Sequence, residues 1–151
     1  MNAIHTRHAG AQYRFTLALG DALRATQAKG AASGLTGFAT PSTLMSDLSL
    51  PAPDLVVAEP HNERNPLPLA NVRIAIEISD ATLESDLGRK ARLYAKHGVP
   101  EYWVIDLEGS VVHQMCSPRA EGYGERREVG FGERLKAETV ADWSVETSGL
   151  N

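Results

Sequence analysis

Cysteine is almost absent from this sequence, and its scarcity excludes two kinds of site. Cys116 is the single cysteine among 151 residues, so the chain cannot close an internal disulfide. The sequence has no Cys-x-x-Cys pair, the spacing that is typical of structural zinc sites. We therefore expect a protein of the reducing cytoplasm, and we interpret Cys116 as a strand residue without a chemical role.

Long apolar runs and a surplus of positive charge are missing as well. No run of about 18 apolar residues occurs, so the sequence predicts no membrane span. The N-terminal segment lacks the layout of a signal peptide, because Arg14 and Asp21 interrupt its apolar residues. The net charge of -4 argues against a protein that relies on non-specific phosphate contacts, but it is compatible with an enzyme whose acids hold a divalent metal.

What the sequence does contain is a regular alternation of apolar segments. Apolar residues spaced three and four apart predict a helix over 8–28, and Gly98 with Pro100 ends a second helix predicted over 83–97. Strands are predicted at 35–39, 43–48, 53–58, 72–79, 101–107 and 110–116, followed by a further hairpin. We expect one domain over 1–151, of class α/β or α+β with one mixed sheet, and flexible tails at 1–7 and 144–151.

Glu77 stands inside the most apolar of these predicted strands. The core face of that strand is defined by alternating branched aliphatics, Val72, Ile74, Ile76 and Ile78. Because side chains alternate along a strand, Glu77 lies on the other face, beside the small Ala75. Two interpretations follow, a glutamate exposed on an edge strand and a carboxylate that is available to a cleft.

Lys90 is a second anomaly, on the helix that follows this strand. At 100° per residue it falls inside the apolar arc that contains Leu87 and Tyr94, whereas Arg89, Arg92 and Lys96 fall on the opposite face. Burying an unpaired ammonium is costly, so its stem either extends to solvent or points into a cleft that contains acids.

Asp54 is the acid that would complete such a cleft. If the strands at 53–58 and 72–79 are neighbours, Asp54 and Glu77 converge on one place; otherwise Asp54 is a turn residue after Pro53. Two carboxylates beside an ammonium suit Mg²⁺ or Mn²⁺, which prefer hard oxygen ligands. A site of this kind can hydrolyse a phosphodiester by activating water.

These segments resemble a known family. "PDLVVAEP" and "IAIEISDATLESDLGRKARLYAKHGVPEYWVID" are similar to the Uma-two family of restriction-endonuclease-like proteins, in the PD-(D/E)xK nuclease superfamily, over about residues 41–135. The motifs that carry the resemblance are Pro53-Asp54, Glu77-Ile78-Ser79, Asp86 with Lys90 and Tyr94, the run from Gly98 to Trp103, and Asp106.

The resemblance implies a restriction-endonuclease-like mixed sheet flanked by helices, with Asp54 and Glu77 as metal ligands. The superfamily lysine that assists the water stands two residues after the acid, where this chain has Ser79. The resemblance therefore implies that Lys90 supplies the amine from the helix. An early glutamate that many members carry before the first helix is missing here, since no acid precedes Asp21.

Supporting positions are Ser79, Asp86, Tyr94, His8 and Gln12. Asp86 either supports the site or caps the helix in its first turn. His8 either approaches the site or belongs to an unstructured tail, and Gln12, one turn later, would line the same cleft. We interpret Tyr94 as a residue of the core or of the cleft wall.

Together these observations predict a Mg²⁺- or Mn²⁺-dependent endonuclease with Asp54, Glu77 and Lys90 as catalytic residues. We expect DNA as the substrate, although no base-reading element separates DNA from RNA or from branched DNA. We also expect a homodimer, because symmetric pairs are the commonest oligomers. The alternative is a binding or assembly module that keeps the nuclease fold without turnover, which the missing early acid and the acidic composition favour.

Overall fold

The structure is a computed structural model that describes the chain except residues 1–2, 31–33, 40–43, 46–49, 62–66 and 151. Its helical segments are α1 (Ala3–Ala28), η1 (Leu69–Asn71), α2 (Leu83–Ser85), η2 (Asp86–Lys90) and α3 (Ala91–Lys96). Its strands are β1 (Thr36–Ala39), β2 (Leu44–Met45), β3 (Leu55–Ala58), β4 (Leu67–Pro68), β5 (Val72–Ser79), β6 (Glu101–Asp106), β7 (Val111–Arg119), β8 (Gly122–Gly130), β9 (Arg134–Lys136) and β10 (Ser144–Glu146).

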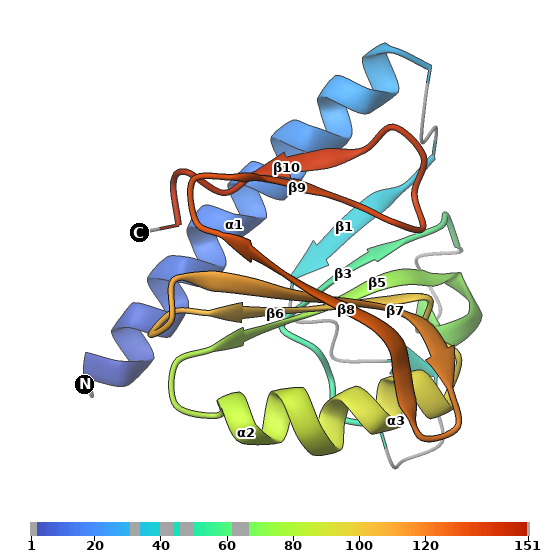
Figure 1. The fold of residues 1–151 in the computed structure, drawn as a ribbon. Coiled ribbons are helices and arrows are strands. Elements are labelled where there is room, and N and C mark those ends of the chain that lie inside the picture. The colour runs from blue at the N-terminus through green and yellow to red at the C-terminus, as the bar shows by residue number, and fades with distance from the viewer. Residues whose placement is uncertain (1–2, 31–33, 40–43, 46–49, 62–66, 151) are drawn as a thin grey trace.

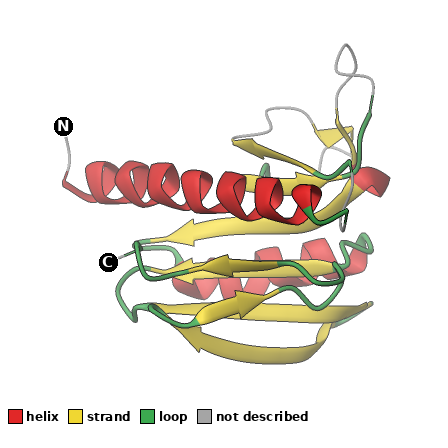
Figure 2. Cartoon of the chain, turned by 90° about the horizontal axis from the view of Figure 1, so that it is seen from above, coloured by secondary structure: helices red, strands yellow, loops and turns green. Residues whose placement is uncertain are grey.

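A six-stranded mixed sheet in the order β1-β3-β5-β6-β7-β8 forms the centre of the fold. Only β5 and β6 pair in parallel within it, and the helical run α2-η2-α3 connects them as a βαβ unit. The expected adjacency of the strands at 53–58 and 72–79 is present, as β3 pairs with β5 antiparallel. Helix α1 and the β9–β10 hairpin lie on one side of the sheet and α2-η2-α3 on the other (Figures 1 and 2).

The spacing of apolar residues in α1 explains its position. Ala11, Phe15, Leu19 and Leu23 recur every four residues, and all are buried in a core that also contains Ile74, Ile76 and Ile78. Phe15 meets Trp103 of β6 edge-on at a centroid distance of 6.4 Å. In the described part of the chain no helix, α1 included, is long and apolar enough to cross a bilayer.

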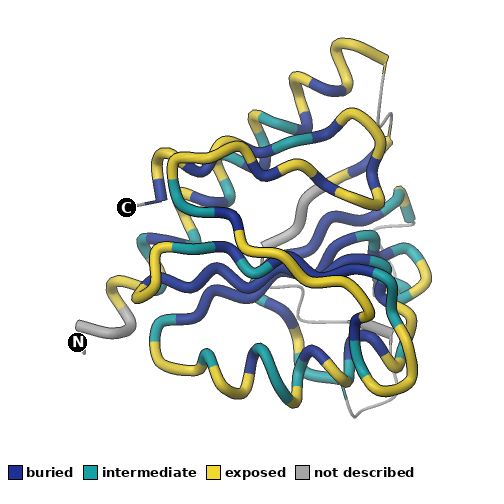
Figure 3. The backbone as a smooth tube through the Cα atoms, viewed as in Figure 1, coloured by how far each residue is buried: buried dark blue, intermediate teal, exposed yellow. Residues whose placement is uncertain are grey.

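A second core lies between the other face of the sheet and α3. Ala91, Tyr94 and Ala95 of α3 pack there against Ala75 and Tyr102 of the sheet. Strand β5 is consequently covered on both faces and is dark blue over most of its length in Figure 3. The helix ends where the sequence predicts, since Gly98 adopts φ 77°, a left-handed conformation that favours glycine.

Both chain ends differ from the expected tails. Helix α1 begins at Ala3, so residues 3–7 belong to the helix and not to a flexible tail. At the other end, β10 pairs with β9, and Leu150 is buried in the α1 core. Just before this segment, Trp143 stacks on Trp103 of β6 at a centroid distance of 5.7 Å. The C-terminal residues are therefore packed against the fold and do not form the expected flexible tail.

Two other expectations need adjustment. Val72 belongs to the α3 core and not with Ile74, Ile76 and Ile78, because the β3–β5 register shifts between Val57 and Ala58. Of the strand expected at 43–48, the structure has Leu44–Met45, while 43 and 46–48 lie outside the described residues.

Candidate active site

Asp54 and Glu77 are brought opposite each other by strand register. Leu55 pairs with Ile76 in the antiparallel β3–β5 ladder, so one step further places Asp54 across from Glu77. Asp54 directly precedes β3, and its charge acts to raise the pKa of Glu77, so the two carboxyls lie near each other. The two acids that the sequence analysis proposed to converge therefore occupy one end of this strand pair.

Asp54 is fixed by the elements on both sides of it. Its Oδ2 accepts a hydrogen bond from the backbone N–H of Ile78 at 2.8 Å and lies 3.2 Å from Nε2 of His8. Gln12, one turn after His8, donates to the backbone carbonyl of Asp54 at 3.2 Å. His8 and Gln12 thus lie beside Asp54, and the tail interpretation of His8 is wrong.

Glu77 is almost completely buried, with a relative exposure of 3%. Burial raises the pKa of this carboxyl from its ordinary value of 4.5 to about 8, even though the nearby Lys90 ammonium acts in the opposite direction. The structure therefore excludes the exposed edge-strand interpretation. Without a further cation, Glu77 holds a proton near neutral pH.

The hydroxyl of Tyr94 lies against the carboxyl of Glu77. It lies 2.8 Å from the carbonyl oxygen of Pro51 and 3.1 Å from Oε1 of Glu77. A phenol has one hydrogen, so Tyr94 donates it either to the Pro51 carbonyl or to the Glu77 carboxyl, the two acceptors within its reach. Burial and the charge of Glu77 raise the pKa of Tyr94 further above its usual range, which keeps the phenol neutral.

Lys90 reaches inward from the helix between two acids. Its Nζ lies 2.7 Å from Oδ1 of Asp86 and 3.2 Å from Oε2 of Glu77. Burial alone would lower the pKa of Lys90, but the two carboxylates outweigh it and leave the pKa above its usual value. The Lys90 side chain is only 20% exposed. Its ammonium therefore points toward acidic side chains and does not extend to solvent.

Asp86 and Ser79 complete the buried polar group. Asp86 does not cap a helix, because it follows the first turn and its carboxylate faces Lys90. Ser79 is 1% exposed, and within the described part of the chain its hydroxyl has no hydrogen-bond partner. Thr82 was not among the predicted site residues, yet its hydroxyl donates to Oδ2 of Asp86 at 2.6 Å. A threonine four residues before a helical acid was the available signal.

The donor set fits a hard divalent cation. Both side-chain contacts of Asp54 among the described residues use Oδ2, so Oδ1 is available, and Glu77 supplies a second carboxylate. No group of three or more His, Cys, Asp and Glu side chains able to hold a metal occurs in the described ranges. Two carboxylates are enough for Mg²⁺, because this ion is usually bound by one or two carboxylates and keeps several waters.

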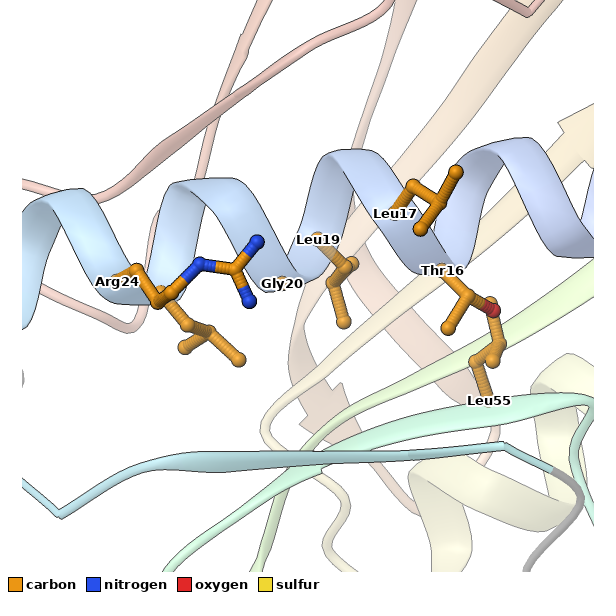
Figure 4. Close-up of a pocket in the computed structure, with 7 residues that line it drawn as sticks. Thr16, Leu17, Leu19, Gly20, Arg24 and Leu55 are labelled. Atoms are coloured by element: carbon orange, nitrogen blue, oxygen red, sulfur yellow. The ribbon is translucent and has the colours of Figure 1, made fainter.

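One hollow of the surface lies apart from these residues. A pocket of about 260 Å³ opens between α1 and β3 and contains neither the carboxylates nor Lys90. Figure 4 labels its lining residues Thr16, Leu17, Leu19, Gly20, Arg24 and Leu55. The candidate catalytic residues therefore form a polar cluster between α1, β5 and the α2-η2-α3 helix, and they do not line this pocket.

Comparison with protein families gives a match over almost the whole chain. The model of the Uma2 family, described as "Putative restriction endonuclease", matches residues 1–148. No curated protein matches the chain.

The solved structures that are similar to the chain include the following two. One is a protein from Anabaena variabilis ATCC 29413, described as "a putative nuclease belonging to DUF820", with a TM-score of 0.65 and 15% identity over 95% of this chain and 79% of that one. The other is described as "the type IIG restriction endonuclease BpuSI", with a TM-score of 0.47 and 12% identity over 74% of this chain and 12% of that one. The first likeness concerns the fold alone, and the second is too weak to carry weight.

Proposed function

The chain belongs to the Uma2 family, and from this premise we propose that it is a divalent-metal-dependent nuclease that hydrolyses phosphodiester bonds in DNA. Its fold is the restriction-endonuclease-like mixed sheet flanked by helices. One observation carries the proposal. Glu77, a buried carboxyl opposite Asp54, lies 3.2 Å from the ammonium of Lys90 on the single helix that connects the parallel strands. Such an arrangement is costly for stability, and sites of this kind are commonly functional.

Each residue has a separate part in the proposed reaction. Asp54 and Glu77 would hold the cation, which when bound supplies an activated water and offsets phosphate charge. The ammonium of Lys90 orients that water and the scissile phosphate from the helix side. Tyr94 directs one oxygen of Glu77, and His8 and Gln12 fix Asp54, so the two carboxylates keep their positions.

The metal dependence is tested by nicking of supercoiled plasmid at increasing Mg²⁺ or Mn²⁺, with EDTA as the reference. We expect cleavage only with metal, and Asp54→Asn should lower it by on the order of 100-fold or more, because the amide keeps the shape but loses the charge. Glu59→Gln is the matched control, since that acid pairs with Arg73 away from the site. Cleavage in EDTA, or an active Asp54→Asn protein, would contradict the proposal.

The same assay separates DNA from the other substrates. Labelled single-stranded RNA and a branched DNA junction are offered under identical conditions, and we expect plasmid DNA to be cleaved fastest. Preference for RNA or for the junction would reassign the substrate without changing the chemistry.

An inactive binding module is the second candidate. It is favoured by one observation: both oxygens of Glu77 already have partners, Tyr94 and Lys90, so the polar group is closed without a metal. A purified protein that binds DNA equally with and without Mg²⁺ and cleaves none of the substrates would establish this alternative.

We also propose that the protein acts as a homodimer. The sheet ends in two edge strands, β1 and β8, and α1 exposes Tyr13 (66%) and Leu17 (49%). Sedimentation at micromolar concentration should give twice the chain mass of 16.3 kDa. A monomer at every concentration would contradict this prediction.

A further inference from the structure

Asp86 is the most buried acid around Lys90, and the proposed reaction does not use it. Its side chain is 1% exposed, compared with 4% for Glu77 and 20% for Lys90. A carboxylate taken out of water is costly unless it is paired and hydrogen-bonded. Its position therefore requires a partner, and Nζ of Lys90 at 2.7 Å is nearer to Asp86 than to Glu77, at 3.2 Å.

The surroundings of Asp86 hold it as a fixed support. Thr82 donates to its Oδ2 at 2.6 Å, and the Asp86 N–H donates to the carbonyl of Thr82 at 2.9 Å. The hydroxyl of Tyr102, on β6, donates to the Asp86 carbonyl at 3.0 Å. The residue is thus tied to the preceding loop and to a central strand.

Both carboxylate oxygens of Asp86 have partners within the chain. One of its oxygens receives the Thr82 hydroxyl and the other faces Lys90, so neither is turned toward solvent. Asp86 and Lys90 are also the first and last residues of η2, a π-helical turn. π-turns inside helices are rare and occur often at functional sites, where they redirect side chains.

We propose that Asp86 is a positioning residue that holds the ammonium of Lys90 beside Glu77. In this role Asp86 touches neither the cation nor the substrate and acts only through Lys90. The inference rests on the proposed nuclease function, since it assigns the support of that same site. It explains why a buried acid stands one helical turn before the lysine and why Thr82 and Tyr102 fix it.

A double-mutant cycle tests whether Asp86 acts through Lys90. Asp86→Asn should lower kcat by on the order of 100-fold and leave KM nearly unchanged, because a misplaced ammonium affects the reacting geometry more than substrate binding. In the Lys90→Met background the same change should have no further effect on kcat. Glu84→Gln, an exposed acid two residues earlier, is the control. Losses that multiply in the double variant would overturn the proposal.

Thermal unfolding gives a second readout that needs no cleavage. Lys90→Met leaves Asp86 buried without its ammonium and should lower the melting temperature, whereas adding Asp86→Asn to it should recover about 5 °C. A purely structural Asp86 predicts the reverse, a further loss in the double variant. If the wild type cleaves nothing, the nuclease proposal fails, while this cycle still decides the role of Asp86.

The position of the ammonium itself is observable by ¹⁵N NMR of the lysine side chains. The Lys90 signal should be detectable in the wild type, because a buried ion pair slows exchange with water, and should be lost in Asp86→Asn. Thr82→Val keeps every charge and removes only the support of Asp86, so it should weaken the signal without unfolding the chain. An unchanged Lys90 signal in both variants would show that Asp86 does not hold the lysine.

Discussion

Replacing Lys90 by methionine is expected to lower plasmid cleavage by about 100- to 10,000-fold, the range in which a positioned acid–base group contributes to catalysis. Methionine keeps the length and apolar character of the stem and removes the charge. The ammonium lies 3.2 Å from Glu77, so its loss changes the carboxyl that would hold the cation as well as the group that orients water.

Stability should respond to the same substitution. Lys90 pairs with Asp86 as well as with Glu77, and Lys90→Met leaves both buried acids without an ammonium. Breaking a buried pair in this way costs about 3–5 kcal/mol when the remaining acid stays charged, so the variant should be assayed below its melting temperature. Lys96→Met, on the exposed side of α3, should change neither cleavage nor stability. A folded, fully active Lys90→Met protein would refute the assigned role of the lysine.

Replacing Glu77 by glutamine is expected to remove most of the cleavage activity and at the same time to stabilise the metal-free protein at alkaline pH. The loss of activity should be on the order of 1,000-fold, because an amide is a poor ligand for a hard cation. The gain in stability follows from burial, since glutamine preserves the shape of Glu77 and carries no charge to desolvate.

The sign of the pH dependence follows from the raised pKa. Below pH 4.5 Glu77 is protonated in both the folded and the unfolded chain and contributes nothing. Between 4.5 and about 8 the unfolded chain loses this proton while the folded chain keeps it, so the free energy of unfolding falls as pH rises. Each pH unit in that window is worth up to about 1.4 kcal/mol.

Urea unfolding of the metal-free proteins at pH 5 and pH 8 measures this effect. The wild type should lose stability relative to Glu77→Gln between the two values, and saturating Mg²⁺ should restore the wild type alone. Glu84→Gln should follow the wild type throughout, because that acid is exposed. Parallel stability curves for the wild type and Glu77→Gln would show that Glu77 titrates normally.

Much of the fold could be predicted because its patterns are local. The period-two run of Ile74, Ile76 and Ile78 and the stop at Gly98 both correspond to the structure. The chain ends could not be predicted in this way. Helix α1 begins at Ala3, five residues before the expected start, and the C-terminal strand depends on pairing with β9 and on Trp143 stacking over Trp103.

The site was predictable in part. The pattern placed Lys90 within an apolar arc and suggested that acids face it, and the structure places Glu77 and Asp86 there. The pattern left two alternatives for His8, the site or a tail, and could not decide between them, because the contact with Asp54 joins residues 46 positions apart in the sequence. The burial of Glu77 could not be predicted either, because a strand pattern shows which face a residue occupies but not how closely a neighbouring helix covers that face.

Binding of Mn²⁺ followed by its EPR signal is the measurement that tests the metal site most directly, because it depends on the ligands and not on finding the right substrate. We predict that the wild type binds Mn²⁺ in competition with Mg²⁺ and that the Asp54→Asn/Glu77→Gln protein, correctly folded by circular dichroism, does not. Equal Mn²⁺ binding by the two proteins would contradict the assignment of Asp54 and Glu77 as the metal ligands.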